Sequence, residues 1–352
     1  MTTGPEPSAR TVCPNCGRPV SATDNFCEAC RTELAPAVVS GDAPVTAAEC
    51  PFCHAEQITA DGYCESCGRK VPSSRDHMEL DLGPVAGVTD KGLRHARNED
   101  AMALATAESA TGPAVVAVVC DGVSSSRRPD EASLAAVQAA VRVLLAGVRA
   151  DGDLAETSQA AVAAAQQALA GLDEPGLGDP PSATFVSAVM TTETVTLCWL
   201  GDSRAYWLGS GTGSDAKRLT RDDSVAGEMV AAGLVSEADA MALPGAHVVT
   251  GWVGADSPGA PPHVATFTPP GAGVLLLCSD GLWNYQPEAD GLAGLALPGA
   301  LSDPRGTAAA LVKFALEAGG ADNITVVLAA FPPAAPKSEK EPADEKPSVD
   351  HG

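Results

Sequence analysis

Three aspartates stand where short apolar runs of this sequence begin or end, and their type and position indicate a metal site. They are Asp121, Asp280 and Asp322. Burying a carboxylate is unfavourable unless it is paired or binds a cation. A glycine follows both Asp121 and Asp280, so the backbone can come close enough for a carbonyl or a water to complete the coordination. Three carboxylates that no histidine accompanies favour Mg²⁺ or Mn²⁺ as the bound ion. The alternative is a set of turn residues, because a single Asp-Gly pair is also a common hairpin signal.

Eight of the 11 cysteines precede residue 70 and form four CxxC pairs. These candidate ligands are Cys13, Cys16, Cys27, Cys30, Cys50, Cys53, Cys64 and Cys67. The second four repeat the first at an offset of 37 residues, which indicates an internal duplication. Four thiolates from two tight turns are typical of a tetrahedral structural Zn²⁺ site, so two zinc ions are predicted. Iron–sulfur ligation is an alternative that usually has other spacings, and disulfides are disfavoured in the cytosol.

The residues after the cysteine pairs contain the elements that must position the aspartates. Short runs rich in apolar and β-branched residues predict buried strands over 114–120, 194–200, 274–278 and 324–330. Apolar spacing and alanine-rich stretches predict helices over 131–148, 155–172 and 306–318. The remaining cysteines, Cys120, Cys198 and Cys278, fall inside predicted strands and are interpreted as small buried side chains.

Composition limits the classes of function. The 352 residues carry 22 Lys and Arg against 45 Asp and Glu, which gives a formal net charge of −23. Such an acidic chain repels phosphate backbones, so no nucleic-acid partner is expected. No apolar run approaches the ~20 residues that span a bilayer, and the N-terminus lacks the basic start and apolar stretch of a secretory signal. We therefore expect no membrane partner and a cytoplasmic location.

The cysteine-rich segment resembles a double zinc ribbon over about residues 10–72, including the aromatic residue directly before Cys27 and Cys64. Ribbons of this kind bind either proteins or nucleic acids. Residues 1–75 hold six basic side chains against nine acidic ones and show no basic stripe, so we expect a protein partner on the ribbons. The alternative is that the ribbons only stabilise themselves, because metal binding supplies their folding free energy.

The chain is predicted to divide into four parts. A double zinc ribbon domain over 1–72 is followed by a polar linker over 73–82 and a large domain over 83–331. The tail over 332–352 alternates Pro, Lys and Glu with almost no apolar residues, so it is predicted to be disordered.

Five short motifs follow one another through the large domain. They are Asn98-Glu99-Asp100, Asp121-Gly122, the segment from Gly201 to Tyr206, Ser279-Asp280-Gly281-Leu282 and the segment from Gly319 to Thr325. In this order they resemble the PPM-type metal-dependent protein phosphatases, also called the protein phosphatase 2C family. The resemblance implies an α+β fold, a four-layer sandwich of two antiparallel sheets flanked by helices, and a binuclear Mn²⁺ or Mg²⁺ centre at one end.

The same resemblance implies roles for the matched residues. The implied Mn²⁺ or Mg²⁺ ligands are Asp121, Gly122, Asp280, Asp322 and Asp202, and the further catalytic carboxylates are Glu99 and Asp100. Among them, Asp121 bridges the two metals and Gly122 contributes its carbonyl, whereas Asp202 helps to bind a third, weaker metal. Glu99 and Asp100 act on the second metal directly or through water.

The implied reaction is hydrolysis of phosphoserine and phosphothreonine in proteins, in opposition to a Ser/Thr kinase. It needs no covalent enzyme intermediate, which agrees with the absence of a nucleophilic Cys or Ser constellation. The competing hypothesis is a phosphatase-like adaptor with weak or no activity that binds phosphoproteins while the ribbons dock a partner. The retained Asp121, Asp280 and Asp322 favour the enzyme, because a dead domain has no physical need for three unfavourable carboxylates.

Two departures from the family pattern concern the substrate side of the site. The family usually has an arginine five residues before the aspartate of Asn-Glu-Asp, but this chain has His95 there, with Arg97 nearby. If this stretch is extended, His95 and Arg97 point to the same face, so both are predicted to bind phosphate. The second departure is Ser124-Ser125-Ser126, which replaces the family's Gly-Gly-His and so changes the loop beside the substrate.

Overall fold

The computed structural model describes residues 11–12, 18–20, 29, 38–40, 49–59, 62–174, 176, 178–211, 216–257, 259 and 261–333. The first four candidate zinc ligands, Cys13, Cys16, Cys27 and Cys30, lie outside the described residues, as does the tail from residue 334. Two short strands, β1 (Thr11–Val12) and β2 (Pro19–Val20), pair in the first ribbon region.

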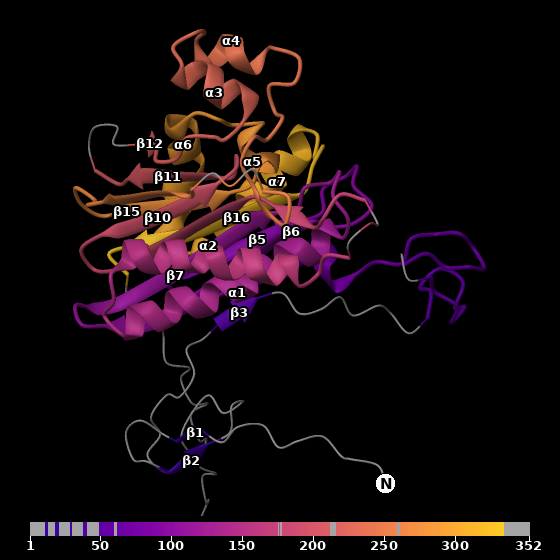
Figure 1. Cartoon of the computed structure of the whole chain (residues 1–352), viewed down its shortest axis with the longest axis horizontal. Coiled ribbons are helices and arrows are strands. Elements are labelled where there is room, and N and C mark those ends of the chain that lie inside the picture. The colour runs from indigo at the N-terminus through magenta and orange to yellow at the C-terminus, as the bar shows by residue number, and fades with distance from the viewer. Residues whose placement is uncertain are drawn as a thin grey trace, which may run out of the picture.

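Two six-stranded sheets form the centre of the large domain (Figure 1). The first runs in the order β14 (His263–Phe267), β10 (Val195–Leu200), β9 (Phe185–Met190), β7 (Gly112–Asp121), β6 (Asp100–Ser109) and β3 (Val38–Ser40). The second runs in the order β12 (Lys217–Arg218), β11 (Arg204–Gly209), β15 (Gly273–Cys278), β16 (Ile324–Phe331), β5 (Val85–Asp90) and β4 (His77–Asp81). All pairings within them are antiparallel. A short pair, β8 (Ser182–Ala183) with β13 (Val253–Gly254), lies beside them.

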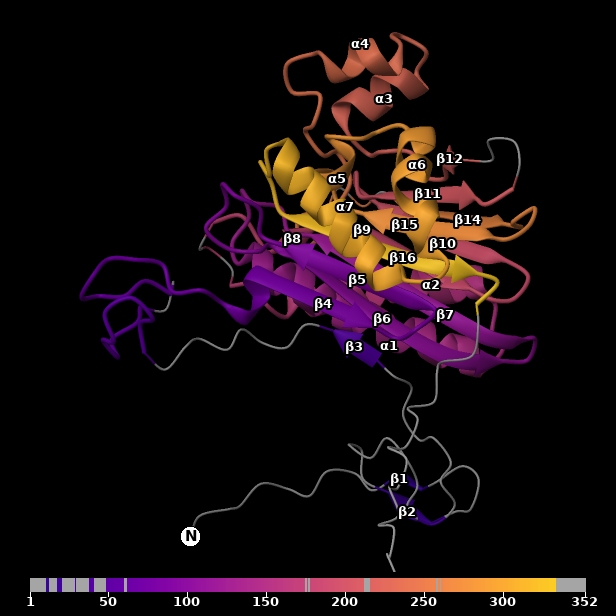
Figure 2. The same cartoon turned by 180° about the vertical axis from the view of Figure 1, so that it is seen from behind.

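Helices cover the outer face of each sheet (Figures 1 and 2). Packed on the first sheet are α1 (Pro129–Arg149) and α2 (Leu154–Ala170). Packed on the second are α5 (Asp280–Trp283), α6 (Ala289–Ala300) and α7 (Pro304–Ala318). A separate flap contains α3 (Val225–Ala231) and α4 (Glu237–Met241) and stands at the top of Figure 1. The predicted four-layer sandwich is therefore confirmed, as are the predicted strands and helices.

Strand periodicity explains the layers. On β7, Val116 and Val118 belong to the core under the helices, whereas Val115 and Val119 belong to the core between the two sheets. Successive strand residues point to opposite faces, and because both faces are buried, the strand is apolar throughout. The three cysteines inside strands are buried as predicted, and burial raises the pKa of Cys198 to about 12, which keeps its thiol protonated.

The predicted linker over 73–82 is not a linker. It contains the turn η1 (Ser74–Asp76), which a capping box of Ser73 and Asp76 closes, and the strand β4, which pairs with β5 along the edge of the second sheet. The stretch is polar because β4 is an edge strand with alternating exposure. The ribbon region therefore joins the sandwich directly.

The helix α1 is long and apolar enough to cross a membrane by length and composition alone. Eleven of its residues are buried, and its apolar face packs against the first sheet and α2. Packing inside the sandwich accounts for its composition.

Candidate metal centre

The fold brings the predicted aspartates together from both sheets. Asp100 begins β6 and Asp121 ends β7, and the antiparallel register places these two residues directly opposite each other. In the second sheet, Cys278 pairs with both Arg204 and Val326. Asp202, Asp280 and Asp322 lie just outside these paired positions, so they occupy the same end of the sheet.

Burial and mutual repulsion dominate the electrostatics of this end. Burial raises the pKa of Asp121 and of Asp280 well above the ordinary range, and neighbouring carboxylates raise both further. Burial likewise raises the pKa of Asp100 to about 6, and burial followed by repulsion from Asp222 raises the pKa of Asp202 to about 7. A cluster of carboxylates in this state favours a bound cation.

Two buried oxygens fit such a cation. The Oδ1 atoms of Asp100 and Asp280 are buried and have no hydrogen-bond partner within the described part of the chain. Buried polar atoms normally have partners. The donor set consists of hard carboxylate oxygens, which suits Mg²⁺ or Mn²⁺ better than a soft metal. The residues present therefore fit the metals that the sequence predicts.

Two glycines let the backbone close around the centre. A Cβ on Gly281 would lie 1.9 Å from the carbonyl oxygen of Asn323, and a Cβ on Gly122 would lie 2.3 Å from that of Pro129. Any side chain at either position would push α5 away from β16 or β7 away from α1. The glycines are thus needed for close approach, as predicted.

Asn323 fixes the loop that carries Glu99, a role that sequence reasoning missed. Its Oδ1 accepts a hydrogen bond of 2.8 Å from the backbone N–H of Glu99. Its Nδ2 donates to the carbonyls of Lys91 at 2.8 Å and Arg97 at 3.0 Å. The only signal in the sequence is its place in the motif after Asp322, because its partners are more than 200 residues away.

Buried hydroxyls hold the Asp100 carboxylate, again beyond what sequence reasoning found. Asp100 Oδ2 accepts hydrogen bonds of 2.7 Å from the hydroxyls of Ser279 and Thr325. The Thr325 hydroxyl also lies 2.7 Å from that of Thr89, which accepts from Asn98 Nδ2 at 2.9 Å. This network leaves only Oδ1 of Asp100 without a partner and so orients it.

Arg75, from the supposed linker, was also missed by sequence reasoning. Its side chain is only 3% exposed and donates to the carbonyl oxygens of Asp130 at 2.6 Å and Asp100 at 3.0 Å. Burial lowers its pKa, while Asp130 and Asp100 act in the opposite direction. It brings a positive charge beside the carboxylate cluster and ties the start of β6 to the start of α1.

The predicted phosphate-binding residues point to different carboxylates. His95 Nε2 lies 3.1 Å from Asp322 Oδ1, whereas Arg97 Nε donates to Glu99 Oε1 at 3.0 Å. Glu99 also accepts a 2.5 Å hydrogen bond from the Ser124 hydroxyl. The stretch around His95 consists of turns and bends, so the extended conformation assumed for a common face is wrong.

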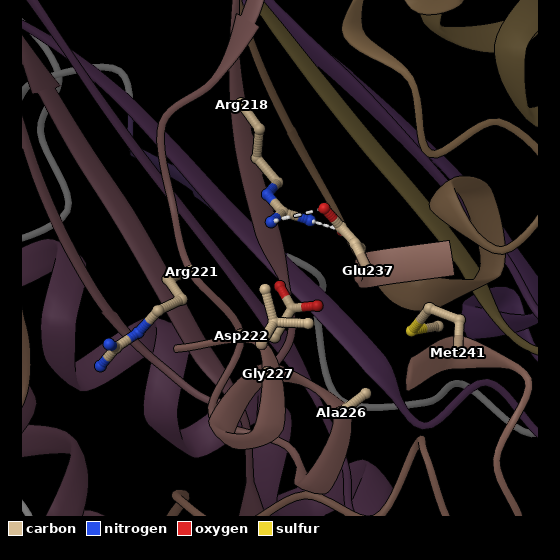
Figure 3. Close-up of a pocket in the computed structure, with 8 residues that line it drawn as sticks. Arg218, Arg221, Asp222, Ala226, Gly227, Glu237 and Met241 are labelled. Carbon is tan, nitrogen blue, oxygen red and sulfur yellow. Dashed lines mark hydrogen bonds and ion pairs between the residues drawn. The ribbon is translucent and has the colours of Figure 1, made fainter. Parts of the chain in front are cut away.

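A buried ion pair connects the flap to the centre. Arg204 is 1% exposed; it donates to Asp222 at 2.7 Å, and its guanidinium lies 3.7 Å from the ring centroid of Trp283. Trp283 Nε1 in turn donates to the carbonyl of Asp202 at 2.9 Å. A small cavity of about 20 Å³ beside this pair is shown in Figure 3, where Arg218 points toward Glu237 of the flap.

The second ribbon contains a separate candidate site. The sulfurs of Cys50, Cys53, Cys64 and Cys67 all lie within 4.8 Å of one another. A backbone hydrogen bond at Cys67 lowers the pKa of Cys64 to about 7. Four sulfurs so arranged fit a tetrahedral Zn²⁺ ion.

Comparison with known proteins agrees with this architecture. Residues 93–289 match the family Protein phosphatase 2C and residues 13–69 match the family Double zinc ribbon. The Serine/threonine phosphatase stp of Listeria welshimeri is 35% identical over 147 residues, 41% of this chain and 55% of that protein. The Serine/threonine protein phosphatase PstP of Mycobacterium tuberculosis is 27% identical over 249 residues, 69% of this chain and 44% of that protein.

The chain thus spans about half the length of these curated relatives. Among solved structures, the catalytic domain of PstP in complex with two manganese ions is 25% identical with a TM-score of 0.53, covering 70% of this chain and 97% of that one. The matched region includes the motifs with Asp121, Asp202 and Asp280. The chain therefore belongs to the protein phosphatase 2C family and has an N-terminal double zinc ribbon.

Proposed function

We propose that this chain hydrolyses phosphoserine and phosphothreonine esters in proteins, using Mn²⁺ or Mg²⁺ ions held by the aspartates of the candidate metal centre. The observation that carries this proposal is the convergence of carboxylates from both sheets, two of which have buried oxygens without partners. The proposed ligands are Asp121, Gly122, Asp280 and Asp322 for two metals, with Asp202 for a third. Such ions supply a hydroxide nucleophile near neutral pH and neutralise charge on the phosphoryl oxygens.

The protein groups around the centre have distinct proposed roles. Asp100 is oriented by two hydroxyls, which would leave its Oδ1 available to the ions. Glu99 is oriented by Arg97 and Ser124 and would hold the second metal directly or through water. Both carboxylates are preorganised, because their hydrogen bonds fix their orientation before substrate binds.

The substrate phosphate is assigned to Arg97. Its side chain is 47% exposed at the rim of the centre, and its planar guanidinium can bind two phosphate oxygens at once. His95, by contrast, holds Asp322 and so serves the metal side of the site. This division replaces the phosphate clamp predicted for the two residues together.

The wider context is also a proposal. The four clustered sulfurs of the second ribbon favour zinc, and the repeat favours a second zinc in the first ribbon. Free, closely spaced thiols suit a reducing cytoplasm, where the enzyme would oppose a Ser/Thr kinase.

The direct test is hydrolysis of p-nitrophenyl phosphate and of a phosphothreonine peptide by purified protein. We expect turnover that requires added Mn²⁺ or Mg²⁺ and that Asp280→Asn abolishes. Turnover that survives removal of divalent metal, or that Asp280→Asn leaves unchanged, would contradict the proposal.

A further inference from the structure

A groove lies between the second ribbon and the sandwich. Its volume is about 730 Å³, which is within the ~300–1,000 Å³ typical of ligand pockets. One wall is formed by ribbon residues Lys70 and Val71, and the other by Leu134 and Ala135 on the first half of α1. Neither the ribbon nor the sandwich forms this groove alone.

The groove is apolar at its base. Leu134 and Ala135 are only partly buried, although most apolar residues of α1 pack into the core. Val71 of the ribbon and Leu172, which follows the end of α2, also line the groove. Charged side chains, among them Arg128, line the same groove. An apolar base with a charged rim is typical of a surface that binds another polypeptide.

The groove is continuous with the candidate metal centre. Arg97 lines it and donates to Glu99. Arg97 also lies 3.6 Å from Asp130, another lining residue, so one guanidinium stands where the groove meets the centre. A polypeptide whose phosphorylated residue reached Arg97 would have the adjoining residues beside the groove.

We infer that this groove binds the extended segment next to the phosphoserine or phosphothreonine of the substrate, with apolar side chains against Leu134 and Ala135. The second ribbon is then one wall of the substrate site and selects among phosphoproteins. The inference rests on the proposed phosphatase function, and it identifies the substrate class as phosphoproteins with an apolar segment on one side of the phosphorylated residue.

The test compares three substrates in the full-length protein with Mn²⁺. They are p-nitrophenyl phosphate, a phosphothreonine peptide with leucine-rich flanks, and one with glycine- and serine-rich flanks. Ala135→Trp fills the base of the groove. The matched control is Ala146→Trp, at an exposed position of the same helix eleven residues further on, which is ~16 Å along the axis.

We expect wild-type protein to prefer the leucine-rich peptide and Ala135→Trp to lower kcat/KM for that peptide by about tenfold, as for loss of a few apolar contacts. Hydrolysis of p-nitrophenyl phosphate should stay within about twofold, since this small ester does not reach the groove. Ala146→Trp should change neither kcat/KM for the leucine-rich peptide nor hydrolysis of p-nitrophenyl phosphate. Two outcomes would overturn the inference while the phosphatase function stands. One is equal kcat/KM for the two peptides in wild-type protein, and the other is an unchanged ratio of these values in Ala135→Trp.

A second variant and a binding measurement keep the outcomes distinct. If Ala135→Trp loses activity on p-nitrophenyl phosphate as well, Gln138→Trp, one turn along the groove, takes its place in the same comparison. If wild-type protein hydrolyses none of the three substrates, the proposed function fails. Fluorescence anisotropy of the labelled leucine-rich peptide then decides: tight binding that Ala135→Trp weakens supports the groove, and binding that it leaves unchanged refutes it.

Discussion

The two candidate metal sites of this chain are built in opposite ways. The sulfur site of the second ribbon comes from one short stretch, Cys50 to Cys67, in which two turns bring four sulfurs within 4.8 Å of one another. The carboxylate centre draws on residues from Asp100 to Asp322, in both sheets, and its groups repel one another. The sulfur site is therefore local, and we expect it to depend on its proposed metal to fold, whereas the carboxylate centre depends on a sandwich that folds around its own apolar core.

This contrast explains why the ligands of the two sites are recognised in the sequence by different patterns. A local site must show its ligands at short, regular spacing, so four CxxC pairs are informative without any model of the fold. A non-local centre shows only isolated aspartates at strand ends. Their significance depends on a strand register that the sequence does not state.

The largest predicted effect separates the two sites. Cys64→Ser removes one ligand of the second ribbon, and structural zinc sites of this kind contribute roughly 10 kcal/mol or more of folding free energy. We expect zinc content to fall from about two ions per chain to about one, and residues 49–72 to lose protection from hydrogen exchange. Hydrolysis of p-nitrophenyl phosphate should stay within a few-fold, because the sandwich does not need the ribbon to hold Asp280.

The control for that prediction is Cys198→Ser, a buried cysteine of β10 that belongs to neither site. It should leave the zinc content unchanged. If Cys64→Ser abolishes p-nitrophenyl phosphate hydrolysis while the sandwich stays folded, the two sites are coupled and the comparison is wrong.

The second prediction concerns the carboxylate centre alone. Asp280→Asn keeps the size of the side chain but removes the charge that the proposed metal requires. We expect kcat for p-nitrophenyl phosphate to fall by about a thousandfold or more, which corresponds to roughly 4 kcal/mol. Zinc content and ribbon protection should not change. Glu317→Gln, an exposed acid on α7, is the matched control and should behave as wild type.

The same contrast shows how far sequence reasoning reached. Asp121 and Asp280 could be predicted as candidates, because several acids at the ends of apolar strands together favour a bound cation, although one Asp-Gly pair alone is a common turn signal. The sandwich could be predicted from strand and helix periodicity together with the family resemblance. The second ribbon's cysteines could be predicted from spacing alone.

Arg75 and Asn323 could not be predicted in the same way. Arg75 lies in a polar stretch that reads as a linker, and its burial depends on carbonyl groups 25 and 55 residues away. Asn323 acts on a loop more than 200 residues earlier. A single sequence carries no signal for such long-range hydrogen bonds, since any surface arginine or asparagine has the same local pattern.

A third prediction separates the roles of His95 and Arg97. Arg97→Ala removes the proposed phosphate ligand, so we expect KM for a phosphothreonine peptide to rise by about tenfold or more, as for loss of a charge-assisted hydrogen bond. His95→Ala loosens Asp322, so the Mn²⁺ concentration for half-maximal activity should rise several-fold with a smaller change in KM. Arg97→Lys should recover only part of the affinity, because lysine lacks the planar fork. The opposite pattern, with His95 controlling KM, would restore the clamp that sequence reasoning predicted.

The last prediction is the smallest and tests the contrast through pH. Without Mn²⁺, the pKa of Asp100 is raised to about 6 and that of Asp202 to about 7. At pH values between the ordinary aspartate pKa and these raised values, the folded sandwich binds more protons than the unfolded chain. Its free energy of unfolding should therefore fall as pH rises through that window. All four tryptophans lie in the sandwich, so tryptophan fluorescence reports its melting temperature without interference from the ribbon.

We expect the metal-free sandwich to melt a few degrees higher at pH 5 than at pH 7.5. Saturating Mn²⁺ should reduce this difference, because the bound ion keeps the carboxylates deprotonated in the folded state. The stability of the ribbon should change in the opposite direction. Its thiols must lose protons to bind zinc, so zinc affinity decreases as pH decreases. A sandwich that melts higher at pH 7.5 without metal would mean that salt bridges elsewhere, and not the repelling carboxylates, govern its stability.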